Sequence, residues 1–183
     1  MDYYVDITSL PDPEFRATVL LNALYTKLHK ALCDIHSTNI GVSFPKHEVT
    51  LGNILRVHAS EKDLKNLQEL NWIAGMSGYC KESLITLVPE GAKFRIVSRK
   101  QAKTSQAKLR RLIKRGSMLE NEAREYKEKM LSHELDSPYV ELMSGSSRQK
   151  YRRYINHGEL FDLPTPGYFD QFGLSKSATI PWF

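Results

Sequence analysis

The sequence predicts a mixed α+β fold, and three observations support that prediction. Short β-branched and aromatic runs alternate with longer segments whose apolar residues recur at the spacing of a helix. The 183 residues, of which 41% are hydrophobic, suffice for one domain or two small domains with a buried core. The net charge also differs between the two halves of the chain, so we expect the halves to have different functions.

The first half predicts a ferredoxin-like domain over residues 1–91. Tyr3–Ile7 is β-branched and aromatic, which predicts a strand, and apolar residues from Glu14 to Ile35 follow the period of a helix. Ser60 and Asp63 resemble a capping box, which predicts the start of a second helix. The remaining predicted strands cover residues 39–44, 51–58 and 84–88. The resulting order β-α-β-β-α-β is that of a ferredoxin-like fold.

The second half, residues 92–183, predicts a second, divergent ferredoxin-like domain that carries an arginine-rich helix. A strand at 94–98 precedes this basic helix, which ends at Gly116 because a residue without Cβ suits a helix C-cap. Ser117 and Glu120 have the spacing of a capping box for a further helix. The other predicted strands cover 139–143, 149–156 and 168–172, and a serine-rich hairpin loop joins the first two.

The charge distribution favours polyanion binding by the second half. Residues 1–91 carry 8 basic and 11 acidic side chains, a net charge of −3, whereas residues 92–183 carry 18 and 10, a net charge of +8. Between Gly91 and Leu119 there are ten Lys or Arg residues and no Asp or Glu. A solvated basic face is the alternative, but an unbroken span of one sign favours phosphate binding.

The basic helix has one apolar stripe and a second, cationic face. At 100° per residue, Leu109, Leu112 and Ile113 share the stripe. The cationic residues have a spacing that suits a nucleic-acid groove, and they are Lys108, Arg110, Arg111, Lys114 and Arg115.

Several protein classes have no support in the sequence. Cys33 and Cys80 form no CxxC pair, so we expect no zinc site and a reducing cytoplasm. His29 and Cys33 share a helix face, but two ligands do not make a metal site. No apolar run approaches the roughly 18 residues of a membrane span, and the acidic start Met1–Asp6 predicts a strand rather than a signal peptide.

His29 is the candidate general base. It lies at the border of the apolar stripe of the first predicted helix, where a histidine is more often a packing residue. RNA, however, carries its own nucleophile, and a neutral imidazole can remove the 2′-hydroxyl proton so that the oxyanion attacks the adjacent phosphate. No metal is required, and no cluster of Asp and Glu suggests a two-metal nuclease.

Three further patterns suit RNA, and each has an ordinary structural alternative. The loop Ser144–Ser147 supplies hydroxyls that can hold a ribose or phosphate oxygen, although hairpin turns use the same residues. Tyr151 and Tyr154 alternate with cations, which suits base stacking or, alternatively, sheet packing. Arg99 and Gln101 are the residue types that pair with guanine and adenine edges.

Taken together, the chain resembles the CRISPR-associated repeat-processing endoribonucleases of type I-F systems, the Cas6-type family also called Csy4. The resemblance runs nearly end to end, and the order and spacing of its segments are specific. These segments are Met1–Ile7, Pro11–Phe15, Lys27–His29, Ile40–Pro45, Val97–Lys103, the arginine-rich helix, Gly173–Lys176 and Pro181–Phe183.

The resemblance implies a metal-independent endoribonuclease that cuts CRISPR transcripts at the 3′ base of the repeat hairpin. It implies a 2′,3′-cyclic phosphate product, no cofactor, and an enzyme that stays bound to mature crRNA as a subunit of the type I-F surveillance complex. A hairpin-binding subunit that does not cut is the alternative, and a general RNA-binding regulator is a third.

The resemblance also implies roles for individual residues. His29 matches the general base, Ser144 the serine that positions the ribose, and Ser146 a serine beside the scissile phosphate. Phe172 stands where the family has a tyrosine that contacts the histidine. The residues matched to RNA binding are Arg99 and Gln101 for the lowest base pairs, the groove-helix residues Arg110, Arg111, Lys114 (an arginine in the family) and Arg115, and Tyr151 for stacking under the stem.

Overall fold

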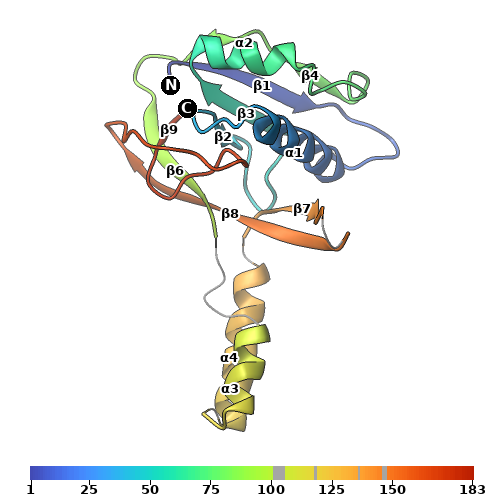
Figure 1. Ribbon diagram of the computed structural model, residues 1–183, viewed down its shortest axis with the longest axis vertical. Coiled ribbons are helices and arrows are strands. Elements are labelled where there is room, and N and C mark those ends of the chain that lie inside the picture. The colour runs from blue at the N-terminus through green and yellow to red at the C-terminus, as the bar shows by residue number, and fades with distance from the viewer. Residues whose placement is uncertain (101–105, 118, 136, 146–147) are drawn as a thin grey trace. The chain divides into compact units, whose positions relative to one another are not determined.

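The structure is a computed structural model that describes residues 1–100, 106–117, 119–135, 137–145 and 148–183 (Figure 1). It is a mixed α+β protein with two β-sheets, as the sequence predicts. Its contacts divide it into two units, of which the first comprises Met1–Arg99 and Pro138–Phe183 and the second Lys100–Ser137.

The first sheet belongs to the N-terminal part of the first unit and has the order β2-β3-β1-β4, with β5 also paired to β1. All its described pairs are antiparallel, and both the sheet and the element order are compatible with a ferredoxin-like arrangement. The elements are β1 (Tyr3–Ser9), α1 (Ala17–Asp34), β2 (Gly41–Ser43), β3 (Ile54–Ala59), α2 (Glu61–Glu69), β4 (Cys80–Glu82) and β5 (Thr86–Leu87).

The strand predicted at 84–88 is wrong in extent, because in that range β5 covers Thr86–Leu87 alone and a separate short strand, β4, lies before the range. Between them the Ser83 hydroxyl accepts a hydrogen bond from the Asp6 amide at 2.9 Å, and the Ser83 amide donates to the Asp6 carbonyl. A side-chain oxygen therefore takes the place of a backbone acceptor, which interrupts the ladder along β1.

The second sheet has the order β7-β8-β6-β9. The predicted hairpin is present, since Met143 at the end of β7 pairs with Lys150 at the start of β8. The final strand, however, is formed at the chain's end and not at 168–172 as predicted. The elements are β6 (Lys93–Arg99), β7 (Tyr139–Met143), β8 (Lys150–Phe161) and β9 (Ile180–Trp182).

Residues 168–172 form no strand because a tight turn begins there. The Asp170 carboxylate accepts hydrogen bonds from the amides of Phe172 and Leu174 at 2.9 and 3.0 Å. Gly173 has φ +69°, which favours glycine, and a Cβ there would lie 2.6 Å from Val42 Cγ1. The polar and aromatic side chains that suggested a strand therefore surround a turn packed against β2.

A single hydrophobic core joins the two sheets within the first unit. Helix α1 contacts β1 and β3 of the first sheet and β7 of the second. Asn22 on α1 also accepts a hydrogen bond from the Glu141 amide on β7 at 3.1 Å. The core takes residues from both halves of the chain, among them Leu24, Leu28, Leu32, Val57, Val140, Leu142, Ile155 and Ile180.

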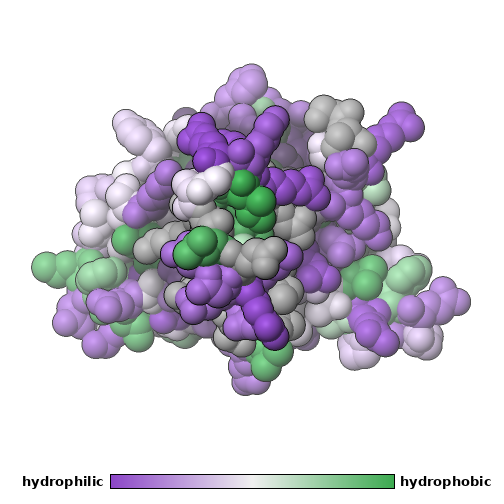
Figure 2. Space-filling model, turned by 90° about the horizontal axis from the view of Figure 1, so that it is seen from below, coloured by the Kyte–Doolittle hydropathy of each residue, from purple (hydrophilic) through white to green (hydrophobic). Residues whose placement is uncertain are grey.

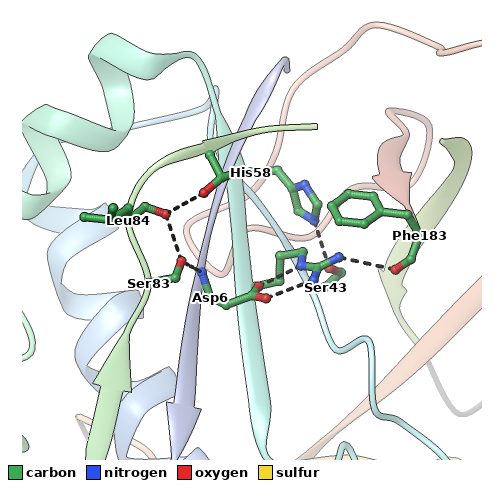
Figure 3. Close-up of polar contacts among 8 residues, drawn as sticks. Asp6, Ser43, His58, Ser83, Leu84 and Phe183 are labelled. Carbon is green, nitrogen blue, oxygen red and sulfur yellow. Dashed lines mark hydrogen bonds and ion pairs between the residues drawn. The ribbon is translucent and has the colours of Figure 1, made fainter. Parts of the chain in front are cut away.

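A buried arginine connects the first sheet to the end of the chain, and its partners Asp6 and Phe183 are labelled in Figure 3. The Arg56 guanidinium donates to both carboxylate oxygens of Asp6, at 2.7 and 2.9 Å, and to the Phe183 carbonyl at 3.3 Å. It also lies over the rings of Tyr4 and Phe183. The bidentate ion pair compensates the burial of the charge and holds the C-terminal segment on β3.

The second unit contains α3 (Gln106–Lys114) and α4 (Glu120–Leu135). Gly116 has φ +66° and ends α3 as predicted, with its amide donating to the Ile113 carbonyl. The capping box predicted at Ser117 is wrong, because the Ser117 amide and hydroxyl both donate back to the Leu112 carbonyl at 3.2 Å. Ser117 therefore belongs to the C-terminal cap of α3, and α4 begins later, at Glu120.

The first sheet is built from strands between Tyr3 and Leu87 and the second from strands between Lys93 and Trp182, while the domain boundary near residue 91 stays a prediction.

Hydrophilic side chains predominate on the face shown in Figure 2, and hydrophobic side chains form small separate groups there. Within the described ranges, no helix is long and apolar enough to cross a membrane.

A fully buried histidine and a partly buried one, His58 and His157, predict how stability depends on pH. Burial, reinforced by Arg56, lowers the pKa of His58 to about 3, and burial together with His47 and Arg95 lowers the pKa of His157 to about 3. Both are therefore neutral in the folded protein, while an unfolded histidine titrates near pH 6.5. We expect the free energy of unfolding to fall from about pH 6.5 towards pH 3, by up to roughly 1.4 kcal/mol per pH unit for each histidine.

Urea denaturation at pH 7, 5.5 and 4.5 measures this dependence. A His157→Phe variant should show a shallower slope, by about one proton, and the variant His36→Asn, which replaces an exposed histidine, should keep the original slope. An unchanged slope in His157→Phe would contradict the assignment.

Candidate active site

His29 lies on α1 at the edge of the core, with one ring nitrogen fixed by a backbone carbonyl. Its neighbour Leu28 is fully buried, whereas the His29 side chain is only partly buried. His29 Nδ1 lies 2.8 Å from the Gln171 carbonyl oxygen. Because a carbonyl oxygen can only accept, Nδ1 carries the hydrogen and Nε2 of the neutral ring keeps a free lone pair. This tautomer is the one that a general base at Nε2 requires.

The His29 ring stacks on the ring of Phe172. The two centroids are 3.6 Å apart and the planes are inclined by 11°. The Arg153 guanidinium carbon lies 3.5 Å from the same Phe172 centroid. Two groups this close to one centroid cannot share a face, so Phe172 lies between the imidazole and the guanidinium. The imidazole is thus restrained by a ring on one side and a hydrogen bond at Nδ1.

The turn that carries Gln171 and Phe172 is itself held in place. The Tyr25 hydroxyl, on the same helix as His29, donates to the Phe172 carbonyl at 2.8 Å. Burial strongly raises the pKa of Tyr25, so its hydroxyl stays protonated and donates at neutral pH. On the other side, the Val42 amide donates to the Gly173 carbonyl at 2.9 Å. The turn is therefore attached to both α1 and β2.

Cys33 lies one turn after His29, as their spacing predicts. Its Sγ is 3.6 Å from His29 Nδ1 and donates to Gln171 Oε1 at 3.3 Å. Burial, and secondarily the charge of Asp34, raises the pKa of the Cys33 thiol, so it remains a neutral donor at neutral pH. Cys33 thus adds one more contact between α1 and the turn.

A cleft of about 380 Å³ brings four of the predicted site residues together. Its lining residues come from α1, the end of β6 and the β7–β8 hairpin, and they are Thr26, His29, Arg99, Leu142, Met143, Ser144, Gly145, Tyr151 and Arg153. The predicted base, the predicted ribose-positioning serine and the predicted stacking tyrosine therefore share one opening. Gln101 and Ser146 lie outside the described residues.

The predicted cationic face of α3 is exposed to solvent, within the second unit. Arg110, Arg111, Lys114 and Arg115 are all exposed, and the side chain of Lys108 lies outside what the structure describes. Of the predicted apolar stripe, Leu109 is buried, but Ile113 is 52% exposed. The apolar stripe predicted for α3 is thus wider than the face that is buried, because α3 packs within this unit on α4, a single neighbouring helix.

Sequence reasoning missed three groups that position His29. The Gln171 contact uses a backbone carbonyl, which no residue type reveals. Tyr25 has the pattern of an ordinary core residue of α1, and its hydroxyl contact spans 147 positions in sequence. Arg153 was visible only as one cation beside Tyr151 and Tyr154.

The arrangement is suited to proton abstraction from a hydroxyl placed in the cleft. Nε2 supplies a lone pair in the neutral ring, and hydroxyl-bearing and cationic residues line the same cleft. In the described part of the chain, no group of three or more His, Cys, Asp or Glu side chains is placed to hold a metal ion.

Comparison with known proteins identifies the family. The family model described as CRISPR-associated protein (Cas_Csy4) matches residues 4–183. The chain is 42% identical over 184 residues to the CRISPR-associated endonuclease Cas6/Csy4 of Escherichia coli (strain UTI89 / UPEC), with 100% of both chains covered. It is 40% identical over 187 residues to the protein of the same name in Pseudomonas aeruginosa (strain UCBPP-PA14), again with 100% of both covered. This chain, in which a histidine bonded to a turn shares a cleft with a serine hairpin, belongs to the Cas_Csy4 family of CRISPR-associated proteins.

Proposed function

We propose that this protein is a metal-independent, sequence-specific endoribonuclease that processes CRISPR precursor transcripts. It cuts each repeat at the 3′ base of its hairpin and stays bound to the mature crRNA. The observation that carries the proposal is the hydrogen bond from His29 Nδ1 to the Gln171 carbonyl, which selects the tautomer whose Nε2 can act as a base, on a residue that lines a cleft together with Ser144. The relatives' name, CRISPR-associated endonuclease, supports the same conclusion.

The reaction needs no external nucleophile. His29 Nε2 removes the proton from the 2′-hydroxyl of the nucleotide before the cut, and the resulting oxyanion attacks the adjacent phosphorus. The bond from phosphorus to the 5′-oxygen of the next nucleotide breaks, which leaves a 2′,3′-cyclic phosphate and a 5′-oxygen that takes up a proton. Ser144 positions the ribose, and Ser146 lies beside the scissile phosphate.

The RNA hairpin is held by three sets of residues. The cations of α3 enter the groove of the stem and contact phosphates, and all four whose side chains are described are exposed for this. Arg99 and Gln101 read the lowest base pairs. Tyr151, which lines the His29 cleft, stacks under the stem.

The protein's further associations follow from the same proposal. It acts in the cytoplasm with no cofactor, and after cleavage it remains a subunit of the type I-F crRNA-guided surveillance complex. Its two sheets are the cores of two ferredoxin-like domains, the first carrying His29 and the second carrying the RNA-binding residues.

A hairpin-binding subunit that does not cut is the second candidate. One observation favours it: Phe172, which stacks on His29, has no hydroxyl, so it cannot exchange a proton during the reaction. The two candidates differ in a single measurable property, which is cleavage of the bound repeat.

The first prediction for this proposal concerns the nucleophile. Cleavage of the host's repeat RNA should proceed in excess EDTA, because the attacking oxygen belongs to the RNA. A 2′-deoxy substitution just before the cut should abolish cleavage and leave binding intact. Gel analysis of the products measures both effects, and cleavage of the deoxy substrate or a strict need for Mg²⁺ would overturn the mechanism.

A second prediction separates cutting from binding. His29→Ala should slow single-turnover cleavage by about 10²–10⁴-fold and leave affinity for the hairpin unchanged, since it removes only the base. Arg115→Ala should instead weaken binding and reduce the salt dependence by about one phosphate contact.

Each variant has a matched control. The control for His29→Ala lies on the same helix, α1, and the control for Arg115→Ala lies on α4, in the same unit as α3. Lys30→Ala changes an exposed residue beside His29 on α1, and Arg124→Ala changes an exposed arginine on α4. Both should behave as the unmodified protein. If His29→Ala lost as much affinity as Arg115→Ala, the proposed division of functions would be wrong.

A third prediction tests the stacked ring. Phe172→Ala should slow single-turnover cleavage about three- to tenfold, because an aromatic contact worth about 0.5–1.5 kcal/mol is lost. Phe172→Tyr should change the rate little, since the ring remains. The rate at saturating enzyme, with folding checked by melting temperature, measures both. A Phe172→Tyr rate a hundredfold higher would favour the second candidate function.

A further inference from the structure

Arg153 is a buried arginine without a polar partner. It lies on β8 and is only 7% exposed, and its side chain makes no hydrogen bond or ion pair with any residue in the described ranges. Its Nε is completely buried and unpaired. The preceding residue, Arg152, points to the opposite face of the strand and is exposed.

The other buried arginine in the described part of the chain shows what is missing. Arg56 is 9% exposed and is neutralised by both carboxylate oxygens of Asp6. A buried guanidinium without such a partner is costly, and the ring face of Phe172 compensates only part of that cost. Asp170 lines the same region, but it forms no ion pair with Arg153, and its Oδ1 accepts from the amides of Phe172 and Leu174.

Arg153 lines the cleft in which the proposed function places the phosphate charge of the RNA. It lines the His29 cleft together with Ser144 and Tyr151. It also lines a second cleft, of about 460 Å³, that contains Ser37 and Thr38. Arg99 is the one other residue common to the linings of these two clefts. An RNA strand that crosses from one cleft to the other would therefore pass both Arg99 and Arg153.

We propose that Arg153 is a phosphate-binding residue of the cleavage site and that its partner is a non-bridging oxygen of the scissile phosphate. This inference rests on the proposed function. The planar guanidinium suits a phosphate, and a cation at this position also stabilises the extra negative charge that develops on the phosphorane during attack. Phe172 then has a second role, which is to hold the imidazole and the guanidinium on its two faces.

The decisive experiment couples a change in the protein to a change in the RNA. The probe is the repeat hairpin with a 2′-deoxy nucleotide before the cut, with either a normal phosphate or a neutral methylphosphonate at the scissile position. The unmodified protein should bind the methylphosphonate RNA about 10- to 100-fold more weakly, because a charge-assisted contact is lost. Arg153→Met, which keeps the packing volume, should bind both RNAs with the same weakened affinity.

Further variants separate phosphate binding from packing. Arg153→Lys should retain part of the discrimination between the two RNAs, because it keeps the charge without the planar group. Arg152→Gln, the neighbour on the exposed face, should discriminate as the unmodified protein does. Single-turnover cleavage of the all-ribose hairpin by Arg153→Met should also fall at least tenfold at saturating enzyme, and melting temperatures check that each variant is folded.

The outcomes are distinct. If the unmodified protein cuts the repeat but Arg153→Met still binds the methylphosphonate RNA more weakly than the phosphate RNA, by the same factor as the unmodified protein, the inference fails while the proposed function stands. Arg153→Met with unchanged affinity and rate also overturns the inference. If the unmodified protein neither binds nor cuts the repeat hairpin, both the proposed function and the inference fail.

Discussion

The attachment of the turn at residues 170–174 to helix α1 is the constraint on which the rest of the site depends. The Gln171 carbonyl selects the tautomer of His29, and the Phe172 ring sets the plane of the imidazole. The Tyr25 hydroxyl fixes the turn from the side of the helix, so a displaced turn would release the base. Gly173 makes this close approach possible, since Val42 leaves no space for a Cβ. The histidine is thus positioned by a backbone carbonyl together with an aromatic side chain.

The common core explains how residues distant in sequence reach one cleft. Helix α1 packs against both sheets, and Asn22 bonds to the β7 backbone, which brings the Ser144 hairpin beside His29. The Arg56–Asp6 pair fixes the end of the chain on the first sheet, nine residues after the turn ends. The cations of α3 belong to the other unit, so the proposed base and groove contacts are carried by separate parts of the protein.

Sequence patterns failed where a side chain bonded to the backbone. The strand predicted at 168–172 is a turn because the Asp170 carboxylate satisfies two amides that a strand would have paired. Ser117 caps the end of α3 and not the start of α4, since its hydroxyl donates to Leu112. Periodicity cannot detect such local competition, because it reads apolar spacing alone. Ile113 is exposed for a related reason. Periodicity predicts an apolar stripe on α3, but it does not show how much of that stripe the neighbouring helix α4 covers.

The sequence by itself determined the α+β class, most of the helices and strands, the cationic helix and the candidate base, because periodicity, one-sided charge and residue chemistry are local properties. It also carried the resemblance to the family to which the chain belongs. Only the tertiary structure decided which nitrogen of His29 is free, which residues share its cleft and that Arg153 is buried without a partner. These depend on contacts between segments more than a hundred residues apart, and on a backbone carbonyl that every residue possesses.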